Sequence, residues 1–233
     1  MSIKKIAGTV TAAIDLSPTA KEVTLTLDAP LACLPGYFIN LFMDVGGVHV
    51  RRAYSVVHTD EITHTLTIAV RHTREGTMTP EFWKPEIIGR AVTVMGPMGV
   101  NTADTFTHPH VFLFAFGIGA GVIHAVADYA QRAPHTERMT IVTGSRNEED
   151  IIYKTYFDAL QQNDSRISVR YVLSDPHTPQ YPYTGYIQNN IDDLVYNDAD
   201  IYMCGQVAAC DGLMKKIQEQ NPQNVTFFVE AFH

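Results

Sequence analysis

One short segment combines residue types that could do chemistry. In RRAYSVVH, residues 51–58, two guanidinium groups, a flat aromatic ring and a hydroxyl lie within five residues. Side chains alternate between the two faces of a strand, so Arg52 and Tyr54 share one face while Arg51 points away. The same pattern also occurs in an exposed strand with a cross-strand aromatic pair. The surroundings of the segment must decide between these interpretations.

A glycine loop provides the second candidate. In GIGAGVIHAVADYA, the glycines 117, 119 and 121 follow an apolar run and open a helical pattern. Bare backbone at the start of a helix suits a phosphate group. The dinucleotide-binding fingerprint, however, has its third glycine where Val122 stands, and no acidic residue ends the next strand, VTGSR. The alternative is a tight turn that needs small residues for packing. His124, one turn into the helix, is expected to be an ordinary helix residue.

The first part of the chain predicts a sheet. Short β-rich stretches are separated by turn signals such as LPG, GG and GPMG, which indicates an antiparallel sandwich or barrel. The segment GTMTPEFWKP interrupts them, and it predicts a short helix with Thr79 as N-cap and Pro80 as first residue. The strands are expected in IAGTVTAAIDL, KEVTLTLDA, YFINLFMDV, VHVRRAYSVV, HTLTIAVRH and AVTVMG.

The pattern of apolar and polar residues changes near residue 105. Buried-strand runs (VFLFAF, MTIVTG, ISVRYVLS, DIYMCG and VTFFVEAF) then alternate with helical patterns, including NEEDIIYKTYFDALQQ with Asn147 as its cap. Such alternation predicts a parallel sheet with helices on both faces. We therefore expect an antiparallel β-barrel domain over 1–104, followed by a Rossmann-like α/β domain over 105–233.

Composition excludes several classes of protein. The 233 residues carry a formal net charge of −8, which argues against a general nucleic-acid binder. Three cysteines without close pairing predict neither a disulfide framework nor a metal site. The N-terminus is expected to be a strand and not a signal peptide. The segment VFLFAFGIGAGVIHAVA is too short and too rich in glycine for a membrane span. We expect a cytoplasmic protein.

The order of the motifs resembles the ferredoxin–NADP reductase superfamily of flavin-dependent oxidoreductases. The series is Arg-x-Tyr-Ser, Gly-x-x-Thr, GPMG, a glycine loop, CG and a terminal Glu-x-aromatic, and it covers essentially the whole chain. The resemblance implies FAD as cofactor and NADH or NADPH as hydride donor.

The resemblance also implies roles in FAD binding. Arg52 would pair with the pyrophosphate, for which a planar guanidinium is suited. The ring of Tyr54 would lie on the isoalloxazine, and the Ser55 hydroxyl near flavin N5. The second phosphate would be held by the loop from Gly76 to Thr79, where threonine replaces the serine of the family. The implied FAD-binding residues are Arg52, Ala53, Tyr54, Ser55, Val70, Gly76, Thr77, Met78 and Thr79.

In the second domain, the resemblance implies a nucleotide site. The loop with Gly117, Gly119 and Gly121 would lie under the pyrophosphate, although Phe116 and Val122 depart from the glycine and proline of the family. Cys204 and Gly205 would border the nicotinamide, with Gln206 where the family has proline. Ser174, Tyr186 and Gln188 would lie on the adenosine side. The implied catalytic set is Ser55, Cys204, Glu230 and Phe232, with Phe232 covering the flavin.

The resemblance implies hydride transfer from nicotinamide to flavin N5 and delivery of electrons to a separate acceptor. That acceptor could be a ferredoxin, a flavodoxin, a free flavin, a ferric chelate or an oxygenase component. Asp175, where NADPH-using relatives have arginine, favours NADH. The alternative is a non-catalytic flavin-binding regulatory or electron-transfer subunit with a degenerate nucleotide site.

Overall fold

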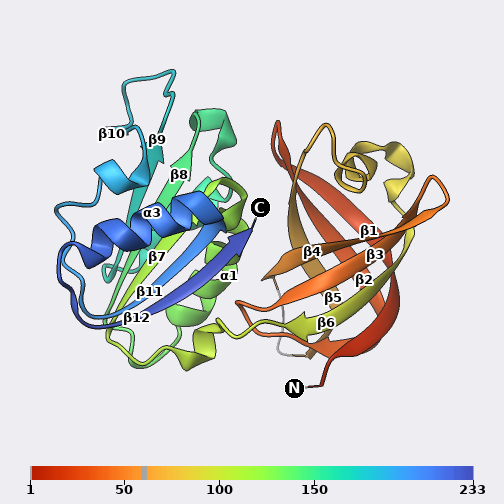
Figure 1. Cartoon of the computed structure of the whole chain (residues 1–233), viewed down its shortest axis with the longest axis horizontal. Helices are drawn as coiled ribbons and strands as arrows, with labels where there is room; N and C mark the ends of the chain where they lie inside the picture. Colours follow the sequence, from red (N-terminus) through yellow and green to blue (C-terminus); the bar gives the residue numbers. More distant parts are fainter. Residues whose placement is uncertain (1, 59–61, 233) are drawn as a thin grey trace. The chain divides into compact units, whose positions relative to one another are not determined.

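The computed structural model describes residues 2–58 and 62–232. The chain divides into two compact units, Met1–Ala103 and Asp104–His233, and each unit has its own sheet (Figure 1). The change in sequence pattern near residue 105 lies next to this boundary.

The first unit is a closed barrel of six antiparallel strands, so the predicted antiparallel fold is confirmed and is a barrel. The strand order is β1-β2-β5-β4-β3-β6. Inward-facing apolar side chains, among them Val23, Leu25, Leu41 and Ile68, form its core. Three short 3-10 helices follow β5 or β6. The elements are β1 (Lys4–Ser17), β2 (Ala20–Ala32), β3 (Phe38–Val45), β4 (Val48–His58), β5 (Ile62–Arg71), η1 (Thr79–Trp83), η2 (Pro85–Ile87), β6 (Ala91–Met98) and η3 (Ala103–Thr105).

The pairing between β4 and β5 is short. Among the described residues, the two strands pair only at Val56 with Ile68 and at His58 with Thr67. On its other side, β4 pairs with β3 along its length, from Val48 to Ser55. The barrel therefore stays closed at one end of β4, whereas residues 51–55 present a backbone edge that β5 does not occupy.

The second unit is a six-stranded sheet in the order β10-β9-β8-β7-β11-β12, and every strand pair is parallel. Figure 1 shows α3 on one face of the sheet and α1 on the other, which confirms the predicted doubly covered sheet. The elements are β7 (His110–Phe116), η4 (Gly117–Gly119), α1 (Ala120–Ala130), β8 (Arg138–Ser145), η5 (Glu148–Asp150), α2 (Lys154–Asn163), β9 (Ile167–Leu173), β10 (Tyr183–Thr184), η6 (Ile187–Asn189), β11 (Asn197–Gln206), α3 (Val207–Gln218) and β12 (Gln223–Phe232).

The sequence predicted a helix from Asn147 onward, and its first turns are wrong because the structure has no α-helix before Lys154 in this segment. The Asn147 side chain accepts a hydrogen bond from the Asp150 amide at 3.2 Å, but this caps only η5. Ile151 is extended, Ile152 lies in a turn and both are buried, while Tyr153 has a left-handed φ of 57°. A left-handed residue cannot continue a right-handed helix, so α2 begins only at Lys154. Burial of two adjacent isoleucines outweighs the local helical pattern.

A buried carboxylate binds the segment that precedes β7 at the start of the second unit. Asp200, at 0% exposure in β11, accepts hydrogen bonds from the amides of Thr107 and His108 at 2.7 and 2.8 Å. It also contacts the His108 ring nitrogen Nδ1 at 2.8 Å. Three polar contacts satisfy a carboxylate that burial would otherwise penalise. The hydrogen bond to Asp200 is the main reason that the pKa of His108 is raised above its ordinary value of 6.5.

We predict that His108 makes the stability of the protein depend on pH. A raised pKa in the folded state means that the folded protein holds this proton more tightly than the unfolded chain does. The contribution should be complete below pH 6.5 and be lost as pH rises through the raised pKa. The free energy of unfolding of the wild type, minus that of His108→Asn, should therefore decrease from pH 6 to about pH 9. Denaturant titrations at several pH values measure this difference, and a difference that does not change with pH would contradict the prediction.

Candidate functional site

Arg52 is the exposed cation of the β4 edge. One nitrogen of its guanidinium donates to the backbone carbonyl of Arg51 at 2.7 Å, and the residue is exposed. No described carboxylate forms an ion pair with Arg52. A planar guanidinium with unused donors suits a phosphate or carboxylate group.

Tyr54 has a polar group without a protein partner. Its ring packs edge-on against Phe82 with 6.1 Å between the ring centroids. Its hydroxyl is buried and has no hydrogen-bond partner among the described residues. Burial raises the pKa of Tyr54, and the nearby charge of Arg52 partly opposes this rise. Because an unpaired buried hydroxyl costs about 1–3 kcal/mol, the position favours a bound group that supplies a partner.

The loop from Thr73 to Thr79 is tightly folded around one carbonyl group. The carbonyl of Thr73 accepts hydrogen bonds from the Gly76 amide at 2.9 Å and from the Thr79 hydroxyl at 3.2 Å. A Cβ atom at Gly76 would lie 2.4 Å from that hydroxyl, so only glycine fits. The predicted N-cap role of Thr79 is wrong: Thr79 is the first residue of η1, the cap position is Met78, and neither side chain caps the helix. The hydroxyl closes the loop instead.

The other predicted FAD-binding residues differ in exposure. Val70 and Met78 are buried, at 1% and 0% exposure, so they offer a ligand little more than backbone. Thr77 and Ala53 are exposed, and Ser55 is half-buried on the same strand as Arg52 and Tyr54. The structure thus places Arg52, Ala53, Tyr54 and Ser55 together on one strand.

In the second unit, close packing explains one of the three glycines. A Cβ atom at Gly119 would lie 2.2 Å from the carbonyl oxygen of Cys204 in the neighbouring strand β11. Gly117 has a left-handed φ of 56°, which glycine adopts without strain. Gly121 lies buried in the first turn of α1. The glycine turn therefore brings the start of α1 directly against the end of β11.

The carboxyl ends of the neighbouring parallel strands β7 and β11 lie side by side next to this turn. The Phe116 side chain packs on Gly205, where a Cβ atom would lie 2.5 Å from that of Phe116. Ligands of parallel α/β sheets bind beyond the carboxyl ends of the strands. The half-buried Phe116 ring thus adds an apolar surface at the edge where a nucleotide is expected.

Cys204 and Glu230 lie side by side on neighbouring strands. They are register partners of β11 and β12, and Glu230 accepts a hydrogen bond from the Tyr202 hydroxyl at 2.7 Å. Burial, followed by the charge of Glu230, raises the pKa of the Cys204 thiol well above its ordinary value. The thiol therefore stays protonated, and it is not an activated nucleophile. Phe232, the last residue of β12, pairs in register with Gln206 and is half-buried.

Tyr202 is a residue that the sequence-based prediction missed. It stands two positions before Cys204, so its side chain points to the same face of β11. A tyrosine in a buried strand needs a partner for its hydroxyl. This rule could have connected Tyr202 to Glu230, the carboxylate at the end of the last predicted strand.

On the adenosine side of the expected nucleotide site, the charged side chains are engaged in contacts with the protein itself. Arg146 forms an ion pair with Asp175 at 3.4 Å, and the Asp175 amide donates to the Arg146 carbonyl at 2.7 Å. Glu148 accepts hydrogen bonds from the amides of His177 and Thr178, and these lower the pKa of Glu148 to about 2. These contacts hold the loops that follow β8 and β9 together.

Ser174, Tyr186 and Gln188 lie near these loops. The Ser174 amide donates to the Ser145 carbonyl at 3.1 Å. Tyr186 is 69% exposed, so its ring is accessible to a stacking base. The Gln188 amide nitrogen donates to the Ala209 carbonyl at 3.0 Å, which leaves its oxygen for other contacts.

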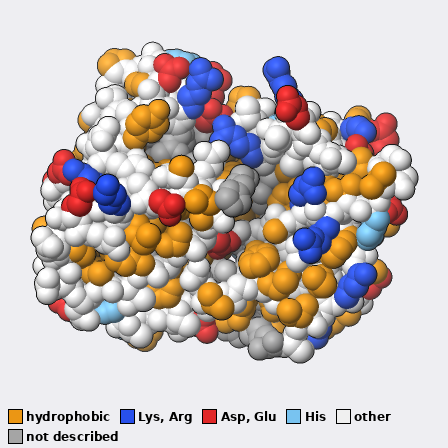
Figure 2. All heavy atoms as spheres, viewed as in Figure 1, with side chains coloured by type: hydrophobic (Ala, Val, Ile, Leu, Met, Phe, Trp, Pro, Cys, Tyr) orange, Lys and Arg blue, Asp and Glu red, His pale blue; other side chains and the backbone are white. Residues whose placement is uncertain are grey.

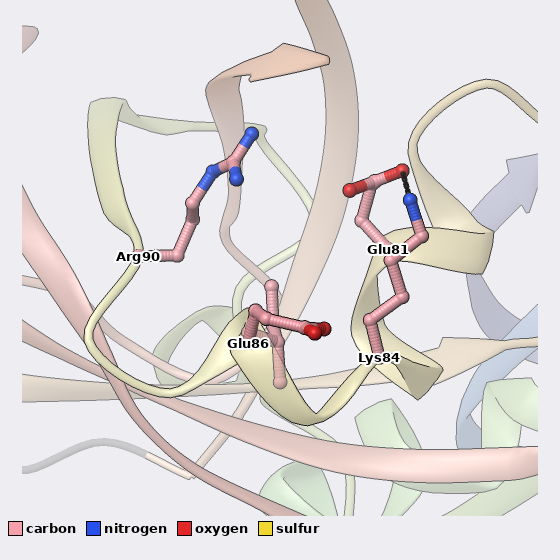
Figure 3. A pocket seen from close by; sticks show the side chains of 5 residues that line it. Glu81, Lys84, Glu86 and Arg90 are labelled. Carbon is pink, nitrogen blue, oxygen red and sulfur yellow. Dashed lines mark hydrogen bonds and ion pairs between the residues drawn. The ribbon is translucent and has the colours of Figure 1, made fainter. Parts of the chain in front are cut away.

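One cavity lies apart from these residues. It has a volume of about 300 Å³ and is lined by Glu81, Lys84, Glu86, Ile87 and Arg90. Figure 3 shows that Lys84 and Glu81 meet in an ion pair, at 2.6 Å, and that Glu86 points into the cavity. Arg90 donates to the Asp44 carbonyl. None of the predicted cofactor-binding residues lines this cavity.

Two family models match the chain. The oxidoreductase FAD-binding domain matches residues 7–102, and the oxidoreductase NAD-binding domain matches residues 113–227. The described residues contain no cluster of three or more His, Cys, Asp or Glu side chains that could hold a metal ion. Within the same residues, no helix is long and apolar enough to cross a membrane.

Relatives agree with these matches. Ferredoxin–NADP reductase B of Sorangium cellulosum is 28% identical over 77% of this chain and 74% of that protein. The phenol 2-monooxygenase reductase component DmpP of a Pseudomonas species is 24% identical over 97% of this chain, which spans 65% of the relative. A solved cytochrome P450 reductase, GcoB of Amycolatopsis, has the same fold with a TM-score of 0.82, at 22% identity over 99% of this chain and 71% of that one.

Fold and motifs define a two-domain oxidoreductase with one domain for FAD and one for a nicotinamide nucleotide. The chain belongs to the ferredoxin–NADP reductase superfamily. The predicted family, fold class and cofactors are thereby confirmed, and so, at the level of the family, is an NAD(P)H-dependent flavoprotein reductase. The roles of single residues stay predictions.

We predict that Gly119→Ala disturbs the second unit. Its new Cβ atom would meet the Cys204 carbonyl at 2.2 Å, so the turn must move away from β11. Overpacking of this kind costs about 1–3 kcal/mol. Gly212→Ala is a matched control, because its Cβ would meet only the Gln188 amide nitrogen at 3.4 Å. The free energy of unfolding should fall for Gly119→Ala and not for Gly212→Ala, and equal effects would contradict the close approach.

Proposed function

We propose that the chain is an NADH-dependent flavoprotein reductase that passes electrons to a separate acceptor. The observation that carries this proposal is the pair on β4: a guanidinium at Arg52 that forms no ion pair with a described carboxylate, beside a buried hydroxyl at Tyr54 that has no hydrogen-bond partner among the described residues. Both lie where β5 does not pair with β4. FAD offers phosphate oxygens for the guanidinium and hydroxyl groups for the tyrosine, so these residues fit the cofactor of the matched domain.

On this proposal, each residue of the barrel has a task. Arg52 binds the pyrophosphate, and the ring of Tyr54, which Phe82 holds in place, supports the flavin ring. Ser55 places its hydroxyl near flavin N5. The tight loop from Gly76 to Thr79 offers backbone amides to the second phosphate. The FAD that these residues would hold would supply the two-electron chemistry between NADH and the acceptor.

In the second unit, the chain positions the nucleotide. The glycine turn at Gly117 and the start of α1 face the pyrophosphate. Tyr186 stacks on the adenine, while Ser174 and Gln188 complete the adenosine side. Phe116 and Gly205 border the nicotinamide, next to Cys204 and Glu230. Phe232 would take the family's role of the aromatic residue that covers the flavin.

The preference for NADH follows from charge. The 2′-phosphate that distinguishes NADPH needs an unpaired cation, but Arg146 is already paired with Asp175. Glu148 and Glu149 add negative charge beside it. A dianionic phosphate would have to displace the Asp175 carboxylate, whereas the ribose hydroxyl of NADH would not.

The acceptor is proposed to be a protein component of an oxygenase. DmpP is named as a reductase component of phenol 2-monooxygenase, and two further relatives are named as a glycine betaine monooxygenase reductase subunit and a 2-halobenzoate 1,2-dioxygenase electron transfer component. Their names support such a partner. A ferredoxin, a flavodoxin, a free flavin and a ferric chelate are the other candidate acceptors.

Purified protein tests the proposal directly. A yellow protein that NADH bleaches under anaerobic conditions would support the reductase. A yellow protein that neither NADH nor NADPH reduces would instead favour a regulatory flavin-binding subunit. Screening acceptor proteins against the bleached form would then identify where the electrons go.

We predict that Arg52→Gln releases FAD while Arg51→Gln does not. Loss of a charge-assisted bond to phosphate costs about 1.5–3 kcal/mol, which corresponds to roughly a tenfold to hundredfold weaker affinity. Arg51 is the matched control, since it is adjacent in sequence but points to the other face of β4. Fluorescence titration with FAD measures both affinities. Equal losses in the two variants would remove the special role of Arg52.

We further predict that Asp175→Asn improves the use of NADPH. The change frees Arg146 from its ion pair and removes a negative charge near the expected 2′-phosphate. The ratio of kcat/KM for NADPH to that for NADH should rise by about tenfold, a change worth 1.4 kcal/mol. Steady-state reduction of a small acceptor with each nucleotide measures the ratio. An unchanged ratio would place the nucleotide-selecting residues elsewhere.

A further inference from the structure

The cavity of the barrel unit is lined by charged groups that the proposed flavin site does not use. It has a volume of about 300 Å³, and its lining residues are Glu81 of η1, Lys84 between η1 and η2, Glu86 and Ile87 of η2, and Arg90 before β6. Small-molecule sites in proteins begin at about this volume. A ligand of this cavity would therefore be a small metabolite, bound in addition to FAD. Figure 2 shows charged side chains set among hydrophobic ones on the surface of the chain.

Backbone hydrogen bonds fix the segment that forms the wall of the cavity. The Ile87 amide donates to the Lys84 carbonyl and the Arg90 amide donates to the Ile87 carbonyl, both at 3.1 Å. The Gly89 amide donates to the Val10 carbonyl at 2.8 Å, and the Val10 amide donates to the Arg90 carbonyl at 3.0 Å. These bonds tie the segment to β1. The wall of the cavity is thus held in place by the fold itself.

Two opposite charges in the cavity are left without an ion pair. Lys84 and Glu81 neutralise each other at 2.6 Å. Glu86 and Arg90, in contrast, form no ion pair with each other or with any other residue that the structure describes. Arg90 donates to the Asp44 carbonyl, which orients its guanidinium but uses only part of its N–H donors. Figure 3 shows Arg90 on one side of the cavity, the Glu81–Lys84 pair on the other, and Glu86 pointing into it.

This set of charges selects the chemical class of a ligand. An anion alone would meet the carboxylate of Glu86, and a cation alone would meet the guanidinium of Arg90. A molecule with one carboxylate and one ammonium group satisfies both, since a guanidinium binds a carboxylate through two bonds and an ammonium donates to a carboxylate. A quaternary ammonium would instead need aromatic faces, and none of the residues described as lining the cavity is aromatic. Ile87, at 5% exposure, adds an apolar surface.

We infer that this cavity binds a free α-amino acid with an apolar side chain. Its carboxylate binds the Arg90 guanidinium, its ammonium group donates to the Glu86 carboxylate, and its side chain lies on Ile87. The inference does not rest on the proposed function, because the cavity contains none of the residues assigned to FAD or to the nucleotide.

The experiment titrates the full chain, loaded with FAD, with L-leucine as probe. Calorimetry measures the dissociation constant, and isocaproate and isoamylamine serve as analogues that lack the ammonium and the carboxylate group, respectively. The fluorescence of Trp83, the single tryptophan of the chain and the last residue of η1, reports independently on the cavity because Trp83 directly precedes Lys84. Glu86→Gln removes the charge that the ammonium group needs. Glu219→Gln is the matched control, because Glu219 is exposed in the other unit and undergoes the same chemical change.

L-leucine should bind the wild type and change the emission of Trp83 with the same dissociation constant. Each analogue should bind at least about tenfold more weakly, since it lacks one charge-assisted contact. Glu86→Gln should weaken the binding of L-leucine by at least about tenfold without weakening that of isocaproate, whereas Glu219→Gln should change neither by more than about twofold.

Arg90→Lys tests the other contact, because it keeps the charge but loses the planar fork. It should weaken the binding of L-leucine and of isocaproate and leave that of isoamylamine unchanged. Denaturant unfolding checks the fold of this variant, since Arg90 also contacts the Asp44 carbonyl. Glu86→Gln tests the inference without this contact.

The inference would be overturned by a wild type that does not bind L-leucine, by isocaproate that binds as tightly as L-leucine, or by equal losses in Glu86→Gln and Glu219→Gln. Binding of L-leucine without a change in Trp83 emission would overturn it as well, because the amino acid would then lie outside the cavity. Anaerobic reduction by NADH tests the proposed function separately. A protein that binds L-leucine through Glu86 but is not reduced would keep this site and lose the reductase.

Discussion

The short pairing between β4 and β5 is the constraint on which the barrel unit depends. A fully paired β4 would have both edges of its backbone occupied and its inward-facing side chains sealed in the core. Because pairing with β5 involves, among the described residues of β4, only Val56 and His58, the inward-facing Arg52 keeps access to solvent. A guanidinium sealed inside a barrel without a partner would be prohibitively costly. At the same place, the buried Tyr54 hydroxyl has no hydrogen-bond partner within the described part of the chain.

The second unit depends on a different constraint, the close approach of two chain segments. The backbone at Gly119 lies so near the Cys204 carbonyl that a side chain cannot fit between them. This contact ties the start of α1 to the end of β11, where Tyr202 holds Glu230 on the neighbouring strand. Packing therefore explains Gly119 without any ligand. A nucleotide would use a turn that the fold already needs.

The pattern of the sequence was sufficient for the fold because strands and helices follow from local periodicity. Alternation predicted the barrel strands, and the change near residue 105 predicted the parallel sheet. Contacts between distant segments could not be predicted in this way. The hydrogen bonds of Asp200 to Thr107 and His108 join residues about ninety positions apart, and the break at Tyr153 arises from burial of the preceding isoleucines. The site was predicted through its motifs, whereas Tyr202 and Phe82, which position motif residues, belong to none.

The doubled arginine shows how one strand can serve two purposes. Alternation sends Arg51 and Arg52 to opposite faces of β4, so two adjacent cations experience different surroundings. Arg52 lies at the opening of the barrel beside an unpartnered hydroxyl, whereas Arg51 joins a cross-strand row with Phe42 on the outer face. A lysine in either place would carry the charge but not the planar fork that binds phosphate or carboxylate through two bonds. The strand thereby separates a site suited to a cofactor from the exposed outer face of the barrel, and keeps both within a few residues of Ser55.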